Sequence, residues 1–157
     1  MPAAKLKQFL DTNNVRYLSI RHSPAYTAQE IAALAHIPGR ELAKTVMVKI
    51  DGSMAMAVLP ATKRLDLDAL KQVAGAQTTS LASEQEFARM FPDCEPGAMP
   101  PFGNLYGMKV YADQTLTADE HIAFNAGTHA ELVQMTYADF ARLVQPAVAT
   151  LSRGAKA

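Results

Sequence analysis

The chain has 157 residues, of which 49% are hydrophobic and 19% charged, and its 15 basic and 15 acidic residues give a formal net charge of zero. This length supports one domain with a hydrophobic core, so we expect a single domain over residues 1–151 and a frayed tail over residues 152–157. A neutral chain is a poor candidate for strong, unspecific binding of nucleic acid, although a local basic patch is still able to dock one nucleic-acid end.

Two further features concern compartment and metals. The longest apolar stretches have the length of strands, so we expect no membrane contact. The only cysteine, Cys94, excludes an intramolecular disulfide and fits the cytoplasm. The four histidines and this cysteine do not follow the spacing of metal ligands, so the sequence predicts no metal and no cofactor.

Helix and strand patterns alternate along the first half of the chain. Asp51 and Gly52 suit a type I′ turn, which predicts a hairpin between the strands on either side. Asp66 is the expected cap of a helix that Gly75 ends. The predicted elements are a helix over 3–14, a strand over 15–21, a helix opened by the capping box at 27–30, strands over 44–50 and 53–59, and a helix over 66–73.

The second half of the chain contains mainly strand patterns. A capping box at Ser83 opens a helix that stops at Pro92, and Thr136 caps a last helix that ends at Pro146. Because the elements do not repeat βαβ units, we expect an α+β fold with a mixed, mostly antiparallel β-sheet flanked by short α-helices. The predicted strands of this half cover 78–81, 105–111, 121–126 and 131–135.

Lys44 is the first candidate for a functional residue. Alternation along its strand places it on one face with Val46, Val48 and Ile50. A lysine at the end of an apolar face is partly desolvated and can hold a negative group in a cleft. The alternative is a structural lysine that extends its ammonium group to solvent from a strand end.

Two loops supply the other candidates. The loop from Cys94 to Gly103 is rich in glycine and proline, which suits it to present backbone groups to a ligand, or merely to connect two elements. An apolar strand ends in a turn at Gly127, followed by Thr128 and His129. His129 could donate a hydrogen bond or act as acid or base, and the alternative is a surface histidine.

These three segments together resemble the YbaK/EbsC family, which includes free-standing relatives of the bacterial prolyl-tRNA synthetase editing domain. The resemblance extends over nearly the whole chain, and its ordered parts are the segment 22–27, the segment 43–45 around Lys44, the Gly-x-x-x-Pro loop from Gly97 to Pro101, and the segment 124–127. It implies the barrel-like, mixed sheet of the editing domain.

The resemblance also implies an activity. The expected function is a trans-editing hydrolase that cleaves the ester between a non-cognate amino acid and the 3′ acceptor end of a tRNA, with an aminoacyl-tRNA synthetase as a further candidate partner. Lys44 would hold the phosphate of the terminal adenosine or the ester carbonyl. Gly97 and its loop would orient the aminoacyl group through backbone hydrogen bonds, and water or the substrate's 2′-hydroxyl would attack.

The resemblance assigns roles to further residues. His129, with Lys44 and Gly97, is a candidate catalytic residue, although this histidine occurs in only some subgroups. Thr45 stands where several relatives carry an asparagine that contacts the ribose. Ile37 is a further candidate for the pocket wall. The substrate-binding candidates are His22, Tyr26, Thr45, Met47, Leu59, Ala98, Met99, Pro101, Gly127 and Thr128.

Other hypotheses remain open. The chain could be a non-catalytic module that binds an aminoacyl-adenosine-like ligand or a synthetase. It could also be a thiol-dependent hydrolase using Cys94, although no base is evident nearby and Glu95 would oppose thiolate formation. Lys63 and Arg64 could contact the acceptor stem or form a solvated turn. The cleaved amino acid could be alanine, cysteine, serine or threonine, and the oligomeric state is open.

Overall fold

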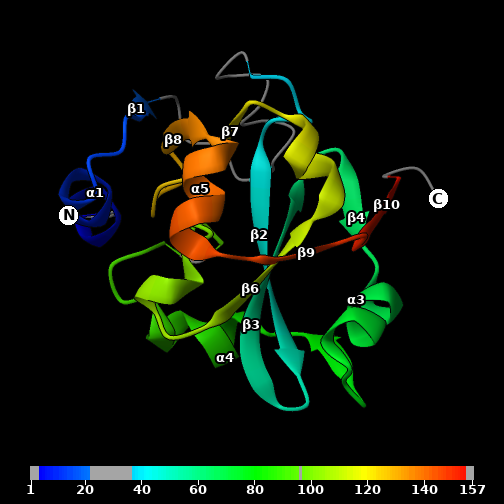
Figure 1. The fold of residues 1–157 in the computed structure, drawn as a ribbon. Helices are drawn as coiled ribbons and strands as arrows, with labels where there is room; N and C mark the ends of the chain where they lie inside the picture. Colours follow the sequence, from blue (N-terminus) through cyan, green and yellow to red (C-terminus); the bar gives the residue numbers. More distant parts are fainter. Residues whose placement is uncertain (1–3, 22–36, 96, 155–157) are drawn as a thin grey trace.

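The computed structural model describes residues 4–21, 37–95 and 97–154, which form a mixed α+β arrangement (Figure 1). The predicted capping box at 27–30 and the candidates His22 and Tyr26 lie outside these residues. The described α-helices are α1 (Ala4–Thr12), α3 (Leu67–Ala74), α4 (Glu84–Phe87) and α5 (Tyr137–Val144), and the 3₁₀ segments are η1 (Ala88–Met90), η2 (Gly103–Leu105) and η3 (Gln114–Ala118). None of these helices is long and apolar enough to cross a membrane.

The described strands form three sheets and do not close into one barrel. The largest has the order β5-β2-β3-β6-β9, the second β1-β8-β7, and β10 pairs with β4. Neighbours are antiparallel except for β3 with β6 and β6 with β9. The strands are β1 (Leu18–Arg21), β2 (Ala43–Ile50), β3 (Ser53–Pro60), β4 (Lys63–Leu65), β5 (Thr79–Leu81), β6 (Lys109–Asp113), β7 (His121–Asn125), β8 (Glu131–Thr136), β9 (Ala147–Ala149) and β10 (Ser152–Gly154).

The hairpin of β2 and β3 confirms the predicted turn. Asp51 and Gly52 have φ values of 50° and 84°, the positive pair that a type I′ turn needs. The Asp51 carboxylate also accepts hydrogen bonds from the N–H groups of Gln77 and Thr78, each at 2.9 Å. The turn therefore fixes both the hairpin register, in which Lys44 lies opposite Leu59, and the approach of β5 to β2.

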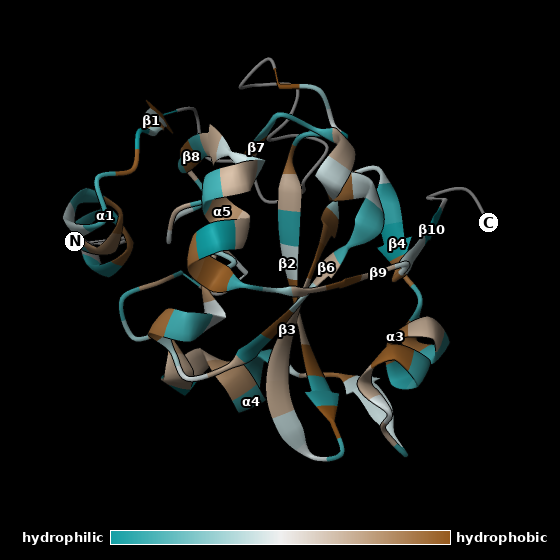
Figure 2. Ribbon diagram, viewed as in Figure 1, coloured by the Kyte–Doolittle hydropathy of each residue, from teal (hydrophilic) through white to brown (hydrophobic). Residues whose placement is uncertain are grey.

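Two core clusters lie on the two faces of β2. The larger contains Met47 and four buried phenylalanines, and the ring of Phe102 is centred 5.4 Å from that of Phe124 and 5.7 Å from that of Phe140. The second contains Val48 together with residues of α3, β6 and the chain just before β10. Figure 2 shows tan and brown segments along the central strands, interrupted by pale and teal ones, and both teal and brown segments in α5. Near the centre of β2, Met47 is buried on one face and Val48 on the other, whereas Lys44, Thr45 and Lys49 are only partly buried.

Several sequence-based boundaries were wrong, and the strand predicted from residue 15 begins only at Leu18. The strand predicted from residue 105 begins at Lys109, because η2 and a hydrogen bond from Met108 N–H to the Gly103 carbonyl turn the chain first. The helix opened by Ser83 ends at Phe87, and η1 follows it. The tail expected to be frayed from Ser152 instead forms β10, because Leu151 anchors it: its N–H donates to the Asp113 carboxylate at 2.8 Å.

Candidate functional site

Two glycine-containing loops meet at the candidate site, one that follows η1 and one that follows β7. The N–H of Glu95 donates to the carbonyl of Gly127 at 2.7 Å, and the N–H of Gly127 donates to the carbonyl of Ala98 at 2.9 Å. The Glu95 carboxylate accepts a further hydrogen bond from the N–H of His129 at 2.6 Å. The two loops singled out in the sequence therefore lie side by side and are fixed to each other by hydrogen bonds.

Gly97 lies at the point where the first loop faces His129. Its φ of +85° belongs to the region that favours glycine. A Cβ atom at this position would lie 3.5 Å from Cε1 of His129, so the imidazole lies directly against the loop. The structure thus brings together two of the three candidate catalytic residues.

The loop from Gly97 to Pro101 contains backbone donors for which no described residue provides an acceptor. Pro101 has no N–H, and the N–H of Ala98 donates to the Glu95 carbonyl at 3.0 Å. Among the described residues, none accepts a hydrogen bond from the N–H of Gly97 or of Met99. Because Gly97 is exposed, its N–H can stabilise negative charge on a ligand oxygen.

Lys44 is a half-buried cation on β2. Within the described part of the chain it forms no ion pair and no side-chain hydrogen bond. Burial lowers the pKa of Lys44 below its ordinary value, and the positive charge of Arg64 lowers it further. An ammonium group that is partly desolvated and lacks a counter-ion is suited to hold an anionic group or a carbonyl oxygen of a ligand.

The start of β2 lies beside β7. Leu42 forms a parallel bridge with Ala123. Two residues farther along the two strands come Lys44 and Asn125, and the loop of Gly127 follows at once. The bridge therefore places the start of β2, with Lys44, beside the end of β7 and the Gly127 loop that follows it.

The remaining candidates differ in burial. Leu59, opposite Lys44, is fully buried, and Met47 and Met99 belong to the larger core cluster. Thr45 and Met47 lie on the face of β2 opposite to Lys44, because strand side chains alternate. Thr45, Thr128 and His129 are half-buried, whereas Ile37, Ala98, Pro101 and Gly127 are buried.

Two residues near the site were absent from the sequence-based candidates. Glu95 joins the two loops, although the sequence suggested only its effect on Cys94. Asn125, in the last position of β7, has a buried side-chain oxygen that accepts no hydrogen bond from any described residue. A buried acceptor without a donor is costly, so a donor on a ligand would be favoured there. The sequence signal that could have identified Asn125 is a polar residue at the end of an apolar strand.

The thiol of Cys94 is not poised for nucleophilic attack. Burial raises the pKa of Cys94 to about 11, and Asp93, whose carboxylate oxygen lies 3.7 Å from Sγ, also raises it. The thiol is therefore protonated near neutral pH, which disfavours a thiol-dependent hydrolase. Among the residues with described positions, no group of three histidine, cysteine or acidic side chains could hold a metal ion.

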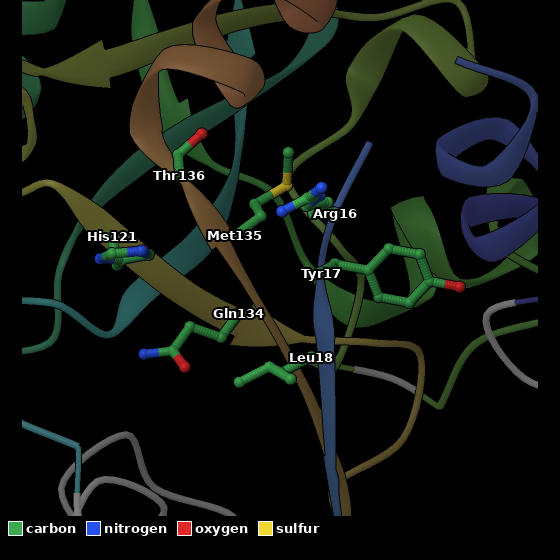
Figure 3. Close-up of a pocket in the computed structure, with 7 residues that line it drawn as sticks. All are labelled: Arg16, Tyr17, Leu18, His121, Gln134, Met135 and Thr136. Carbon is green, nitrogen blue, oxygen red and sulfur yellow. The ribbon is translucent and has the colours of Figure 1, made fainter. Parts of the chain in front are cut away.

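A pocket of about 290 Å³ lies on the sheet of β1, β8 and β7 (Figure 3). Tyr17 and Leu18 point to opposite sides of their segment, and His121 and Gln134 lie on the side of Leu18 (Figure 3). None of the candidate site residues lines this pocket, whose residues are Arg16, Tyr17, Leu18, His121, Gln134, Met135 and Thr136.

Comparison of the sequence with known proteins finds one family. The family model described as aminoacyl-tRNA editing domain matches residues 22–143. The multifunctional Ser/Thr-tRNA deacylase ProXp-y of Escherichia coli (strain K12) is 34% identical over 131 residues, which cover 78% of each chain. A proline–tRNA ligase of Staphylococcus saprophyticus is 32% identical over 101 residues, which are 64% of this chain and 18% of the ligase.

Solved structures share the fold over nearly its full length. A candidate trans-editing enzyme for prolyl tRNA synthetase has a TM-score of 0.82 and 21% identity, with 97% of both chains covered. A candidate signal transduction protein from Marinobacter aquaeolei VT8 has a TM-score of 0.73 and 20% identity, with 94% of this chain and 30% of that chain covered. At these identities the similarity establishes the α+β fold alone.

Proposed function

Because this chain belongs to the aminoacyl-tRNA editing domain family, we propose that it is a trans-editing hydrolase that removes a wrongly attached amino acid from the 3′ end of a tRNA. The observation that carries this proposal is Lys44, a half-buried cation for which no described residue provides a counter-ion, at the start of a strand that lies beside β7 and the glycine loop after it. The similar deacylase of Escherichia coli supports the reaction type.

The proposed reaction is hydrolysis of an ester. Overall one water molecule is consumed: its oxygen ends in the carboxylate of the released amino acid, and one proton ends on the 3′ oxygen of the tRNA. Negative charge develops on the carbonyl oxygen as the carbonyl carbon becomes tetrahedral, and stabilising that charge is the main task of the site. The ester is activated, so the site needs a placed water molecule rather than a strong nucleophile.

The described groups divide this task between them. Lys44 binds the terminal phosphate or the ester carbonyl through its ammonium group. The unused N–H of Gly97 donates to the developing oxyanion, and the hydrogen bonds of Glu95 to Gly127 and His129 hold the two loops in place. His129 contacts the Gly97 loop and orients the aminoacyl group.

We expect the released amino acid to be small and hydroxyl-bearing. The Escherichia coli relative is named for Ser/Thr-tRNA, so seryl- and threonyl-tRNA are the first substrates to test. Alanyl- and cysteinyl-tRNA complete the set, because a hydrophobic pocket separates substrates that differ by one methylene or hydroxyl only modestly. A synthetase partner is a further part of the proposal, since prolyl-tRNA ligases contain a similar segment.

The test compares deacylation by the wild type, Lys44→Ala and a matched control, Lys49→Ala. Lys49 lies on the same strand but on its opposite face, where it donates to Glu86 at 2.6 Å. We expect Lys44→Ala to lower kcat/KM by roughly 10²- to 10³-fold, the usual effect of removing one group that stabilises the oxyanion, while Lys49→Ala retains activity. The panel contains prolyl-, alanyl-, cysteinyl-, seryl- and threonyl-tRNA.

Two outcomes would contradict the proposal. Wild-type rates in a folded Lys44→Ala variant would remove the lysine from the mechanism. Tight binding of the tRNA end with no turnover of any substrate would favour a non-catalytic binding module.

A further inference from the structure

The short ribbon of β4 and β10 places two arginines opposite each other. Arg64 and Arg153 are direct partners in the antiparallel pairing, and both are exposed. Like charges directly opposite each other destabilise a strand pair. Among the described residues, neither arginine has an ion pair or a side-chain hydrogen bond. The ribbon therefore carries two uncompensated positive charges at one position.

The arginine pair, Arg64 with Arg153, lies close to the candidate site. The hairpin register sets Lys44 opposite Leu59, and β4 begins three residues after β3 ends at Pro60. The charge of Arg64 is near enough to lower the pKa of Lys44. Figure 1 shows β4 and β10 side by side at one edge of the molecule. Arg64 thus lies near Lys44 on one side and opposite Arg153 on the other, so it connects the arginine pair with the candidate site.

The opposite face of the ribbon adds neutral and basic donors. Side chains alternate along a strand, so Lys63 and Ser152 lie on the other face from the arginine pair. They line a hollow of about 490 Å³, together with hydroxyl groups of Thr115, Thr117 and Thr150. The one carboxylate there, Asp113, accepts hydrogen bonds from the N–H of Leu151 and from Thr115, and it forms no ion pair with either arginine.

We propose that Arg64 and Arg153 bind the sugar–phosphate backbone of the tRNA acceptor stem, an inference that rests on the proposed function. An RNA end held at Lys44 continues as a chain of phosphates, which must leave the site over a neighbouring surface. The ribbon is a positive surface of this kind. Arginine binds phosphate oxygens through two parallel N–H groups, and such contacts position a nucleic acid without reading its sequence.

A local pair of arginines is also consistent with the zero net charge of the chain. A net charge of zero provides no long-range attraction to RNA, so affinity has to come from a few placed cations. The strain of two opposed arginines is relieved when a phosphate lies between them. An acidic protein surface is the competing occupant, and it predicts no change in RNA binding when the arginines are removed.

The experiment measures binding of an uncharged acceptor-stem minihelix RNA by fluorescence anisotropy between 50 and 200 mM salt, a range over which phosphate contacts change affinity by roughly 3-fold each. The variants are Arg64→Gln, Arg153→Gln and the double variant. Arg89→Gln is the matched control, because Arg89 is exposed, has no ion pair with a described residue and follows α4, away from the ribbon in Figure 1.

We expect each substitution in the arginine pair to weaken minihelix binding and to reduce the salt slope by about 1, with no change for Arg89→Gln. The melting temperature should be unchanged or higher, because the like-charge contact is lost. In hydrolysis, the KM for an aminoacylated minihelix should rise several-fold. The kcat, and the cleavage of an aminoacylated CCA trinucleotide that lacks a stem, should stay the same.

The outcomes separate the two proposals. Unchanged minihelix binding in the double variant would overturn the role of the arginine pair. So would a loss of trinucleotide cleavage as large as the loss of minihelix cleavage. Neither result would contradict the proposed hydrolase activity. If the wild type hydrolyses nothing, the proposed function fails, and binding of the uncharged RNA still decides whether the arginine pair contacts it. A wild type that does not bind the minihelix overturns the inference.

Discussion

At the scale of single residues, Lys44 combines two properties that rarely occur together. Its side chain is half-buried, and no described residue provides a counter-ion. Desolvation favours the neutral amine, whereas an anionic ligand would favour the ammonium form. The charge of Lys44 is therefore sensitive to both pH and ligand, which provides a direct test of its role.

We predict that, as the pH rises, ligand binding at the site is lost at a lower pH than it would be if Lys44 had the ordinary pKa of a lysine. The ammonium form exists below the pKa, and because that pKa is lowered, the charge and the binding are lost earlier as the pH rises. The measurement is titration of an amide-linked, non-hydrolysable aminoacyl-trinucleotide from pH 7 upward. Lys44→Arg should keep binding to higher pH, since arginine stays charged. If the wild type and Lys44→Arg lose ligand binding at the same pH, Lys44 is not the titrating group.

Much of the candidate site could be predicted at this scale, and the missing part has a physical reason. Lys44, Gly97 and His129 could be proposed because a cation on an apolar face and glycines beside polar residues are local patterns, and the structure places Gly97 against His129. Glu95 was missed as a loop-joining residue, because its partners lie more than 30 positions away and no local pattern marks such a contact.

At the scale of elements, α3 shows how local signals define a helix. Asp66 accepts hydrogen bonds from the N–H groups of Asp68 and Ala69 at 3.1 Å each, and Gly75 ends the helix in the left-handed conformation. The helix carries Leu70, which is fully buried in the second core cluster. Asp66 and Gly75 therefore define the ends of the helix that places Leu70 in the core.

We predict that Asp66→Ala lowers the free energy of unfolding by about 1 kcal/mol, because the first-turn N–H groups lose their acceptor. Asp66→Asn serves as the control, since asparagine caps helices about as well as aspartate. Urea denaturation of the three proteins measures the difference. Equal midpoints for the alanine and asparagine variants would show that the cap contributes nothing here.

The elements that sequence patterns predicted best are those with local causes. The turn at Asp51, the cap at Asp66 and the capping box at Ser83 all depend on contacts within a few residues. The strands β4, β9 and β10, each of three residues, were missed. Their pairing partners are distant in the sequence, so only the folded chain defines them.

At the scale of the whole molecule, Leu151 joins elements from three parts of the sequence. Its side chain is 0% exposed and packs in the cluster of Leu70 and Tyr111. Its N–H donates to Asp113 at 2.8 Å, and its carbonyl accepts from the N–H of Asp66 at 2.7 Å. The position of β10, and with it that of Arg153, depends on this anchor.

We predict that Leu151→Ala lowers the free energy of unfolding by about 2–5 kcal/mol, the range for truncating a buried leucine. The control is Leu81→Ala, whose side chain is 60% exposed and should change stability little. Chemical denaturation distinguishes the two. A similar small effect of both substitutions would mean that the end of the chain packs loosely against the rest.

The strand pairings also have a consequence for the order of folding. The β2–β3 hairpin joins neighbours in the sequence and can form in about 1–10 μs, whereas β1 pairs with β8, which puts Leu18 beside Gln134. Such distant contacts close slowly because chain entropy must be lost first. We therefore expect the hairpin that carries Lys44 to form before the loops of Gly97 and Gly127 join. A chain in which only this hairpin has formed would carry the lysine without the glycine loops that hydrolysis needs.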